Sequence, residues 1–211
     1  MEPSNIQIKT PILVKKGNDK KVINTSNRFF QRKVFTFHSF IQHLRLMAKY
    51  RSTMKKLRNE NLISERFFER IMLVCTAVNE CIYCEWGHIG MAKGVGCSEE
   101  EIFSLLDLDF SKVASEEIKG LIFAKEYSSS NGNPSRKLIQ ETIKYYGIEK
   151  TNAIIATILM ITMGNLSGNT VSAFLSRLHG KKTFNGSLIF ELLAFIPVGF
   201  LLHWYYLIDT K

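Results

Sequence analysis

The sequence predicts an all-α fold, and three observations lead to that prediction. Apolar residues between positions 30 and 48 recur at alternating intervals of four and three, the period of an amphipathic helix. The stretch 153–163 is apolar on nearly every side, as expected of a helix buried among others. No segment combines period-two alternation with the turn signals of a β-hairpin. With 211 residues, the chain is long enough for one such domain with a full core.

The N-terminal part is expected to be an arm followed by a long helix. Residues 1–27 contain two polar, turn-like stretches and are expected to be extended or poorly ordered. The helix that follows has an apolar stripe, which we expect to face the core or a neighbouring subunit. The stripe consists of Phe30, Val34, Phe37, Ile41, Leu44 and Ala48. His38 and His43 lie off the stripe and are interpreted as surface or packing residues.

Two helices are expected over residues 64–77 and from about 80 to 93, separated by a break in which Asn79 is a plausible N-cap. Cys75 lies among apolar residues of the first of these helices and is interpreted as a small buried residue. The glycines at 94 and 96 are expected to end the second helix. Cys97 follows them on a loop and is a weaker candidate for a third redox thiol.

The second half of the chain also predicts helices. Ser98 and Glu101 have the spacing of a capping box for one helix, and another is expected over 111–128. Asn133 and Pro134 predict the start of a helix that stops at Gly147. The buried helix from 153 is expected to be interrupted or kinked at 164–168 and to end at Gly180. Asn165 and Asn169 lie in that apolar setting and need hydrogen-bond partners.

The C-terminal stretch 188–208 is apolar except for Glu191 and His203. As one helix it would span about 30 Å, the thickness of a bilayer core. Pro197 and Gly199 interrupt it, and a carboxylate is costly in lipid. We therefore expect residues 28–183 to form the helical domain and residues 184–211 to form a tail packed on the core or on a neighbouring subunit. Membrane insertion is the less favoured alternative.

The net charge of +9 lies almost entirely before Asn59. Nine basic residues and no acidic one occur between Arg28 and Arg58. Such a face can meet an acidic partner, a membrane surface or nucleic acid. Because no nucleic-acid-binding motif accompanies it, we interpret it as a solvated face or a subunit contact. The chain begins without a signal-peptide pattern and has too few cysteines for a disulfide framework, so the cytoplasm is the expected compartment.

The segment 80–88, which reads Glu-Cys-Ile-Tyr-Cys-Glu-Trp-Gly-His, concentrates reactive side chains. On a helix, Cys81, Cys84 and His88 fall within about 60° of one another. An imidazole one turn after a thiol can take its proton, and a second thiol can then close a disulfide. At the start of a helix, the dipole and the unpaired N–H groups lower a thiol pKa. The pattern predicts a thiol redox site.

Together with Glu69, twelve residues before Cys81, this segment resembles the alkylhydroperoxidase D-like (AhpD-like) branch of the carboxymuconolactone decarboxylase family. The matching residues are Glu69, Cys81, Tyr83, Cys84 and His88, with Leu62-Ile63-Ser64 before them and Ser98-Glu99-Glu100-Glu101-Ile102 after them. The resemblance covers about residues 40–180. It implies an AhpD-like helical bundle that forms homo-oligomers.

The resemblance also implies roles for the site residues. Glu69 would reach His88, usually through a water, and the two would activate Cys84, with Cys81 as the resolving partner. Tyr83 stands where the founding hydroperoxidase has a histidine, so it is a possible supporting residue only. The implied activity is that of a peroxidase or thiol–disulfide oxidoreductase without cofactor or metal. Its partners would be a hydroperoxide substrate and an external dithiol or redox protein as reductant.

Three alternatives stay open. Two cysteines, a histidine and a carboxylate are an acceptable zinc set, although zinc sites usually gather ligands from separate elements. The basic helix and the apolar tail would suit a helical module that associates with a membrane or a partner. Decarboxylase chemistry of the same family is less favoured, because the decarboxylases lack the cysteine pair.

Overall fold

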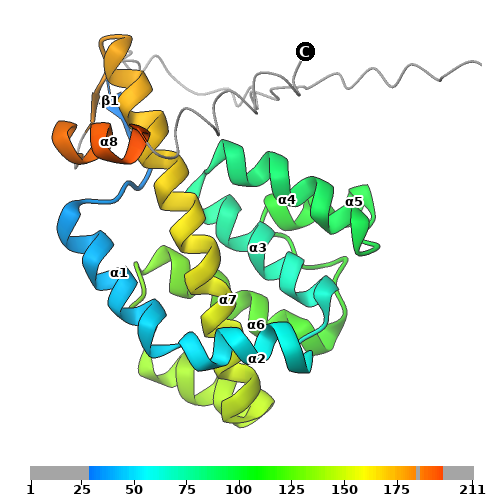
Figure 1. Cartoon of the computed structure of the whole chain (residues 1–211). Coiled ribbons are helices and arrows are strands. Elements are labelled where there is room, and N and C mark those ends of the chain that lie inside the picture. Colours follow the sequence, from blue (N-terminus) through cyan, green and yellow to red (C-terminus); the bar gives the residue numbers. More distant parts are fainter. Residues whose placement is uncertain (1–28, 184–185, 197–211) are drawn as a thin grey trace, which may run out of the picture.

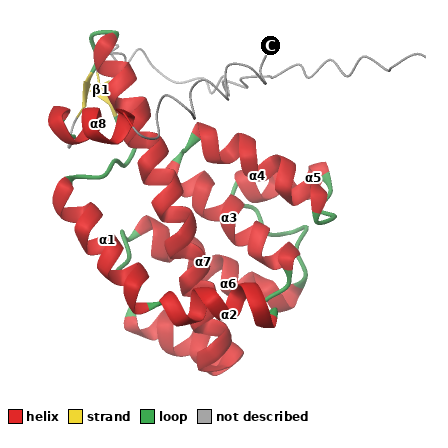
Figure 2. Ribbon diagram, viewed as in Figure 1, coloured by secondary structure: helices red, strands yellow, loops and turns green. Residues whose placement is uncertain are grey.

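A long helix, α7, forms the spine around which the other helices are arranged (Figure 1). The computed structural model describes residues 29–183 and 186–196. In chain order the elements are β1 (Phe29–Phe30), α1 (Phe37–Lys49), α2 (Arg51–Glu60), α3 (Glu65–Asn79), α4 (Ile82–Gly94), α5 (Glu99–Leu106), α6 (Ser115–Ser129), α7 (Arg136–Leu178), β2 (Lys182–Thr183) and α8 (Leu188–Ala194). The prediction of an all-α bundle is confirmed (Figure 2).

The expectations for the arm 1–27 and for the tail beyond 196 lie outside the described residues. Only two short strands accompany the helices in the part that is described, and they form a parallel pair in which Phe29 and Phe30 face Lys182 and Thr183. Helix α3 is the second organising element, because it packs against α4, α5, α6 and α7.

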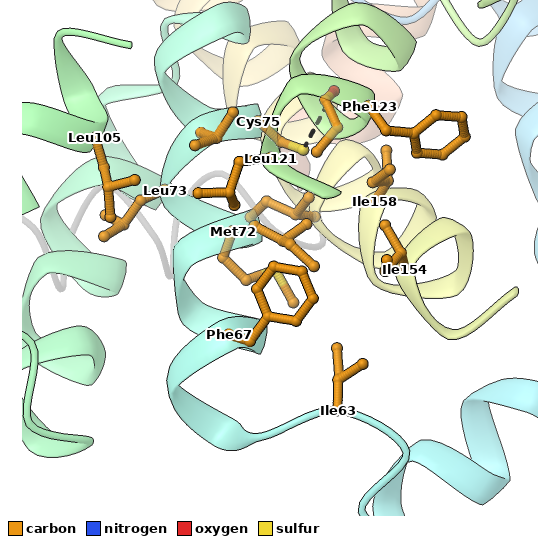
Figure 3. Packing of buried hydrophobic residues seen from close by; sticks show 14 of the residues in the cluster. Ile63, Phe67, Met72, Leu73, Cys75, Leu105, Leu121, Phe123, Ile154 and Ile158 are labelled. Atoms are coloured by element: carbon orange, nitrogen blue, oxygen red, sulfur yellow. Dashed lines mark hydrogen bonds between the residues drawn. The ribbon is translucent and has the colours of Figure 1, made fainter. Parts of the chain in front are cut away.

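The main core is formed where α3, α6 and α7 meet (Figure 3). Phe67, Leu121, Phe123 and Ile158 are among its fully buried side chains. Each such side chain contributes about 1.5–3 kcal/mol relative to an exposed one. Cys75 belongs to this core and is fully buried, as predicted, and burial raises the pKa of its thiol to about 12. It is therefore a packing residue, and the core fixes α3, which carries Glu69.

The first helix begins at Phe37, seven residues later than the apolar spacing predicted. The side chain of Thr36 caps it, accepting a hydrogen bond from the Ser39 N–H, and the two residues form a reciprocal capping box. Phe35 is buried in extended chain just before the cap, and its N–H donates to the Thr170 hydroxyl on α7 (N···O 3.0 Å). These contacts hold residues 31–36 as a strap across α7 instead of a helical turn.

The predicted apolar stripe on α1 is also not its buried face. Phe37 is 68% exposed and Leu44 is 41% exposed. Instead His43 is buried, with its Nε2 2.8 Å from the Leu159 carbonyl oxygen on α7. His43 is thus a packing residue, one of the two roles expected for it. The exposed stripe remains available for the subunit contact that was the other expectation for it.

Several boundaries in the second half of the chain differ from the prediction. Helix α6 begins at Ser115 instead of 111, and α7 is capped by Ser135, whose side chain accepts from the Leu138 N–H. Gly147, with φ 77° and ψ 168°, breaks α7 as expected. The predicted interruption at 164–168 is wrong, because the helix runs through these residues to Leu178. The glycines there serve the packing of a neighbouring site and not a kink.

Helix α8 is attached to α7 by a buried ion pair. The carboxylate of Glu191 is fully buried and accepts from Arg177 Nε at 2.6 Å and from Nη2 at 3.2 Å. Residues 188–194 thus pack against α7. By length and composition, one helix among the described residues, α7, could cross a membrane. Of its most apolar window 61% is buried inside the protein, which makes this weak evidence for insertion.

We expect Glu191→Ala to destabilise the protein by about 3 kcal/mol, because it leaves the charge of Arg177 without its partner. Denaturant unfolding followed by circular dichroism measures the change. Glu149→Ala is the matched control, since Glu149 forms an exposed ion pair with Lys56 and exposed pairs contribute little. Equal stability of the two variants would contradict the inferred role of the buried pair.

Candidate active site

The turn between α3 and α4 brings the predicted site residues together. Helix α3 continues through Asn79, and Glu80 then adopts a left-handed conformation with φ 56°. Cys81 itself is the N-cap of α4, and its sulfur accepts a hydrogen bond from the Cys84 N–H (3.4 Å). The expectation that Asn79 caps this helix is therefore wrong. A cysteine sulfur takes the place that a serine or aspartate oxygen usually has at this position.

The two sulfurs lie side by side. Cys81 Sγ and Cys84 Sγ are 2.8 Å apart, and both cysteines are free. Cys81 is completely buried, whereas Cys84 is partly exposed. A disulfide bond is about 2.05 Å long, so bond formation requires only a small approach of the two atoms. The pair can therefore be oxidised without rearranging the helices.

The surroundings of the two sulfurs separate their acidities. The hydrogen bond between the two sulfurs lowers the pKa of Cys81 below its usual value. The N–H groups of Cys84 and Tyr83 and the charge of Arg32 lower that pKa further, against the effect of burial. The same sulfur–sulfur contact, together with burial, raises the pKa of Cys84. Of the two thiols, Cys81 is therefore the more acidic and Cys84 the less acidic.

Glu69 and His88 form the second half of the site. His88 Nδ1 lies 2.8 Å from Glu69 Oε2, so α3 and α4 are joined by a direct contact at this point. The resemblance implied that a water bridges the two side chains, whereas in the structure they are in direct contact. With Nδ1 engaged by the carboxylate, Nε2 is the ring nitrogen that remains for proton transfer. His88 follows Cys84 by four residues on α4 and thus shares its face of the helix.

Tyr83 supports the site through its backbone and its packing. Its N–H donates to Cys81, and its side chain is buried in a small cluster with Cys81 and Val171. Cys97, in contrast, packs in the main core, and burial raises the pKa of its thiol. The weaker hypothesis of a third redox thiol therefore gains no support from the geometry.

Helix α7 forms the wall behind the sulfurs, a role that the sequence did not predict. A Cβ atom placed on Gly168 would lie 2.8 Å from Cys81 Sγ, and one on Gly164 would lie 3.7 Å from Cys84 Sγ. The two glycines are four residues apart, so they form one small-residue surface on the helix. The segment Gly-Asn-Leu-Ser-Gly was the sequence signal for this surface, but it was taken to predict an interruption of the helix.

The two asparagines of this segment fix the α3–α4 turn. Asn169 Nδ2 donates to the Asn79 carbonyl at 2.7 Å, and the Thr76 hydroxyl lies 3.1 Å from Asn165 Oδ1. Both amide side chains are completely buried. Their role is structural hydrogen bonding, which was the favoured expectation, and it positions the residue pair that precedes Cys81.

Glu101, outside the site, is a buried carboxylate that binds two arginines. Ser98 caps α5 by accepting from the Glu101 N–H, as predicted. The Glu101 side chain instead binds Arg66 at 2.6 Å and Arg70 at 2.7 Å. Although burial opposes it, hydrogen bonds from Arg70, Cys97 and Arg66 hold the pKa of Glu101 below its usual value.

A metal site is not assembled by these side chains. Among residues 29–183 and 186–196, no three His, Cys, Asp or Glu side chains are arranged so that they could hold a metal ion. The direct contact between Glu69 and His88 uses two of the four proposed zinc ligands for each other. The geometry is therefore less suited to the zinc alternative than to proton transfer.

The fold and the site together define an all-α protein with a paired-cysteine centre at a helix start. Residues 42–124 match the model of the Carboxymuconolactone decarboxylase family, and this segment contains Glu69, Cys81, Tyr83, Cys84 and His88. Over this segment the match confirms the resemblance to the family. The α7 wall lies outside the matched residues. No curated protein and no solved structure matches the chain.

The acidities of the two sulfurs can be tested by thiolate absorbance at 240 nm as the pH is raised. We expect one thiolate to form below about pH 9, the usual range of a cysteine. That step should disappear in Cys81→Ser and should move to higher pH in Cys84→Ala, which removes the S–H donor. Cys97→Ser is the control and should keep it. Persistence of the step in Cys81→Ser would assign the charge to another thiol.

Proposed function

We propose that this protein reduces organic hydroperoxides through a Cys81–Cys84 disulfide cycle, with Glu69 and His88 as the proton relay. The observation that carries the proposal is the sulfur pair, 2.8 Å apart at the start of α4, in which the pKa of Cys81 is lowered. The match to the family model supports an activity of this general kind, since members of the family include both peroxidases and decarboxylases. The cysteine pair favours the first over the second.

Cys84 is the better candidate for the sulfur that meets the peroxide, because it is partly exposed and Cys81 is buried. His88 accepts the Cys84 thiol proton, and Glu69 stabilises the resulting imidazolium. The Cys84 thiolate then attacks the terminal peroxide oxygen, and the O–O bond breaks. The departing alkoxide takes the proton from His88 and leaves as the alcohol, while Cys84 becomes a sulfenic acid.

Cys81 completes the oxidative half of the cycle. Its thiolate attacks the sulfur of the Cys84 sulfenic acid, and hydroxide leaves and is protonated to water. One hydroperoxide has then accepted two electrons from two cysteines, which end as a disulfide. An external dithiol attacks the more exposed sulfur, forms a mixed disulfide and restores both thiols by exchange. We further propose a redox protein or small dithiol as reductant, a homo-oligomeric state and a cytoplasmic location.

A coupled assay tests the proposal. Purified protein is supplied with cumene hydroperoxide and with dithiothreitol or dihydrolipoamide, and loss of peroxide is followed. Glu69→Gln keeps the shape of the side chain but loses its charge, so turnover should fall about 10²-fold, as for loss of a proton-transfer group. Glu100→Gln, an exposed residue of α5, is the matched control. Turnover that does not depend on the reductant, or that Glu69→Gln leaves unchanged, would contradict the mechanism.

A further inference from the structure

A cavity of about 1190 Å³ lies between the strap 31–36, α1 and α7, and reaches the loop between α6 and α7. Helix α1, which borders it, is drawn beside the spine helix α7 (Figure 1). Its volume is large enough for a ligand of some tens of heavy atoms. None of the proposed catalytic side chains lines it, and the sequence did not point to it.

The polar lining of this cavity is rich in donors and positive charge. Arg32 and Lys33 contribute the charge, and no aspartate or glutamate occurs among its described lining residues. Arg32 Nη1 is buried and has no hydrogen-bond partner among those residues that the structure describes. The same holds for the side-chain nitrogen of Asn79, a residue only 3% exposed. Buried donors without partners are costly, so a bound acceptor would stabilise both.

Lys33 contributes an ammonium group whose hydrogen-bonding capacity is only partly used. Its Nζ donates to the carbonyls of Ser128 at 2.6 Å and Ser129 at 3.4 Å, at the C-terminal end of α6. An ammonium has three N–H donors, so one remains for a ligand. Burial lowers the pKa of Lys33 from its usual value. A bound anion would offset that desolvation, which adds to the preference for a negatively charged ligand.

The remaining lining is apolar. Val34, Phe35, Leu46, Leu159 and Leu166 contribute it, from the strap, α1 and α7. His43 adds a ring whose pKa is lowered by burial and whose Nε2 is already bonded to the Leu159 carbonyl. The combination of an apolar wall with a cluster of unpartnered donors suits an amphiphile that has one anionic group.

The cavity is connected to the sulfurs through Arg32 and Asn79. The charge of Arg32 helps to lower the pKa of Cys81. It also acts against burial, which raises the pKa of Glu85. Asn79 lines the cavity, and its carbonyl is bound by Asn169 next to the turn that carries Cys81. A ligand whose anionic group reaches Asn79 would therefore contact a residue two positions before Cys81.

We propose that this cavity binds an organic anion with an apolar body, its carboxylate or phosphate held by Arg32, Lys33 and Asn79. Resting on the proposed peroxidase function, we infer that the substrate class is hydroperoxides that carry such an anionic group. Guanidinium groups bind both carboxylate and phosphate in a bidentate manner, so both belong to the class.

Ligand binding is tested first, by a measurement that does not depend on catalytic activity. Octanoate, octyl phosphate and the neutral octanol are titrated into the full-length protein by calorimetry. At least one of the two anions should bind at least about tenfold more tightly than octanol, as expected for a charge-assisted hydrogen bond. Arg32→Gln should remove this preference. Arg45→Gln, an exposed residue of α1 outside the cavity lining, should keep it. Equal affinity for octanol, or an unchanged preference in Arg32→Gln, would overturn the proposal.

The substrate class is tested separately. The ratio of kcat/KM for a fatty-acid hydroperoxide to that for cumene hydroperoxide should fall at least about tenfold in Arg32→Gln. The ratio removes any general effect of Arg32 on the Cys81 thiolate, because that effect applies to both substrates. Cys84→Ser should still bind the preferred anion. If no peroxide is consumed but that anion binds, the proposed function fails and the binding site stands; an unchanged ratio overturns the substrate class.

Discussion

Cys84→Ser should abolish peroxide-dependent turnover, with a loss on the order of 10³-fold or more, as when a nucleophile is removed. A serine hydroxyl is not ionised near neutral pH and does not form a sulfenic acid or a disulfide. The measurement is peroxide consumption with dithiol in excess. Because Cys84 is partly exposed at a helix surface, the substitution is expected to leave the fold intact, which circular dichroism checks.

A matched cysteine variant makes this result specific. Cys97→Ser alters a thiol that packs beside Glu101 and Arg66, and it should retain turnover. Cys81→Ser should behave differently from both, because it keeps the attacking sulfur but removes the resolving one. Its sulfenic acid should accumulate after peroxide and react with dimedone. Full activity in Cys84→Ser, or dimedone labelling that is the same in all variants, would contradict the assigned order of the two sulfurs.

Gly168→Ala should disturb the site although it adds a single methyl group. The new Cβ would lie 2.8 Å from Cys81 Sγ and 3.3 Å from the Tyr83 ring, so the Cys81 side chain must move. Overpacking of this kind costs about 1–3 kcal/mol, and a displaced reacting group lowers turnover by about 10²-fold. Denaturant unfolding and the peroxide assay measure the two effects.

Gly164→Ala is the matched control on the same helix. Its Cβ would meet Cys84 Sγ at 3.7 Å, which is an ordinary contact. Alanine is favoured over glycine inside a helix by about 1 kcal/mol, so this variant should be as stable as the wild type or more stable. If Gly168→Ala were equally harmless in stability and turnover, the wall would not set the position of Cys81.

The sequence predicted the parts of the structure that depend on local spacing. The pair Cys81 and Cys84 and the helix that carries Glu69 follow from residue intervals and caps along one stretch of chain. The start of α1 was missed because the apolar spacing begins at Phe30, whereas the cap at Thr36 and the bond from Phe35 to Thr170 on α7 hold this part of the chain extended. The correct signal, Thr36 followed three residues later by Ser39, was present but weak.

The parts that were missed depend on distant segments. Cysteine is not among the preferred capping residues, so no local rule assigns Cys81 to that position ahead of Asn79. Which helix stands behind the sulfurs is decided by tertiary packing of α7 against α4, over eighty residues away in sequence. The glycine pair was visible, but without the fold its simplest interpretation was a break.

The α7 wall has a consequence for how far the reactive segment can be separated from its host. Residues 42–124 include every proposed catalytic side chain. The glycines that pack behind the sulfurs and the asparagine that binds the Asn79 carbonyl, however, come from residues 164–169. Transferred alone to another protein, residues 42–124 would carry the catalytic side chains without the α7 residues that position them. The chemistry of this centre is thus a property of the complete bundle and not of a portable motif.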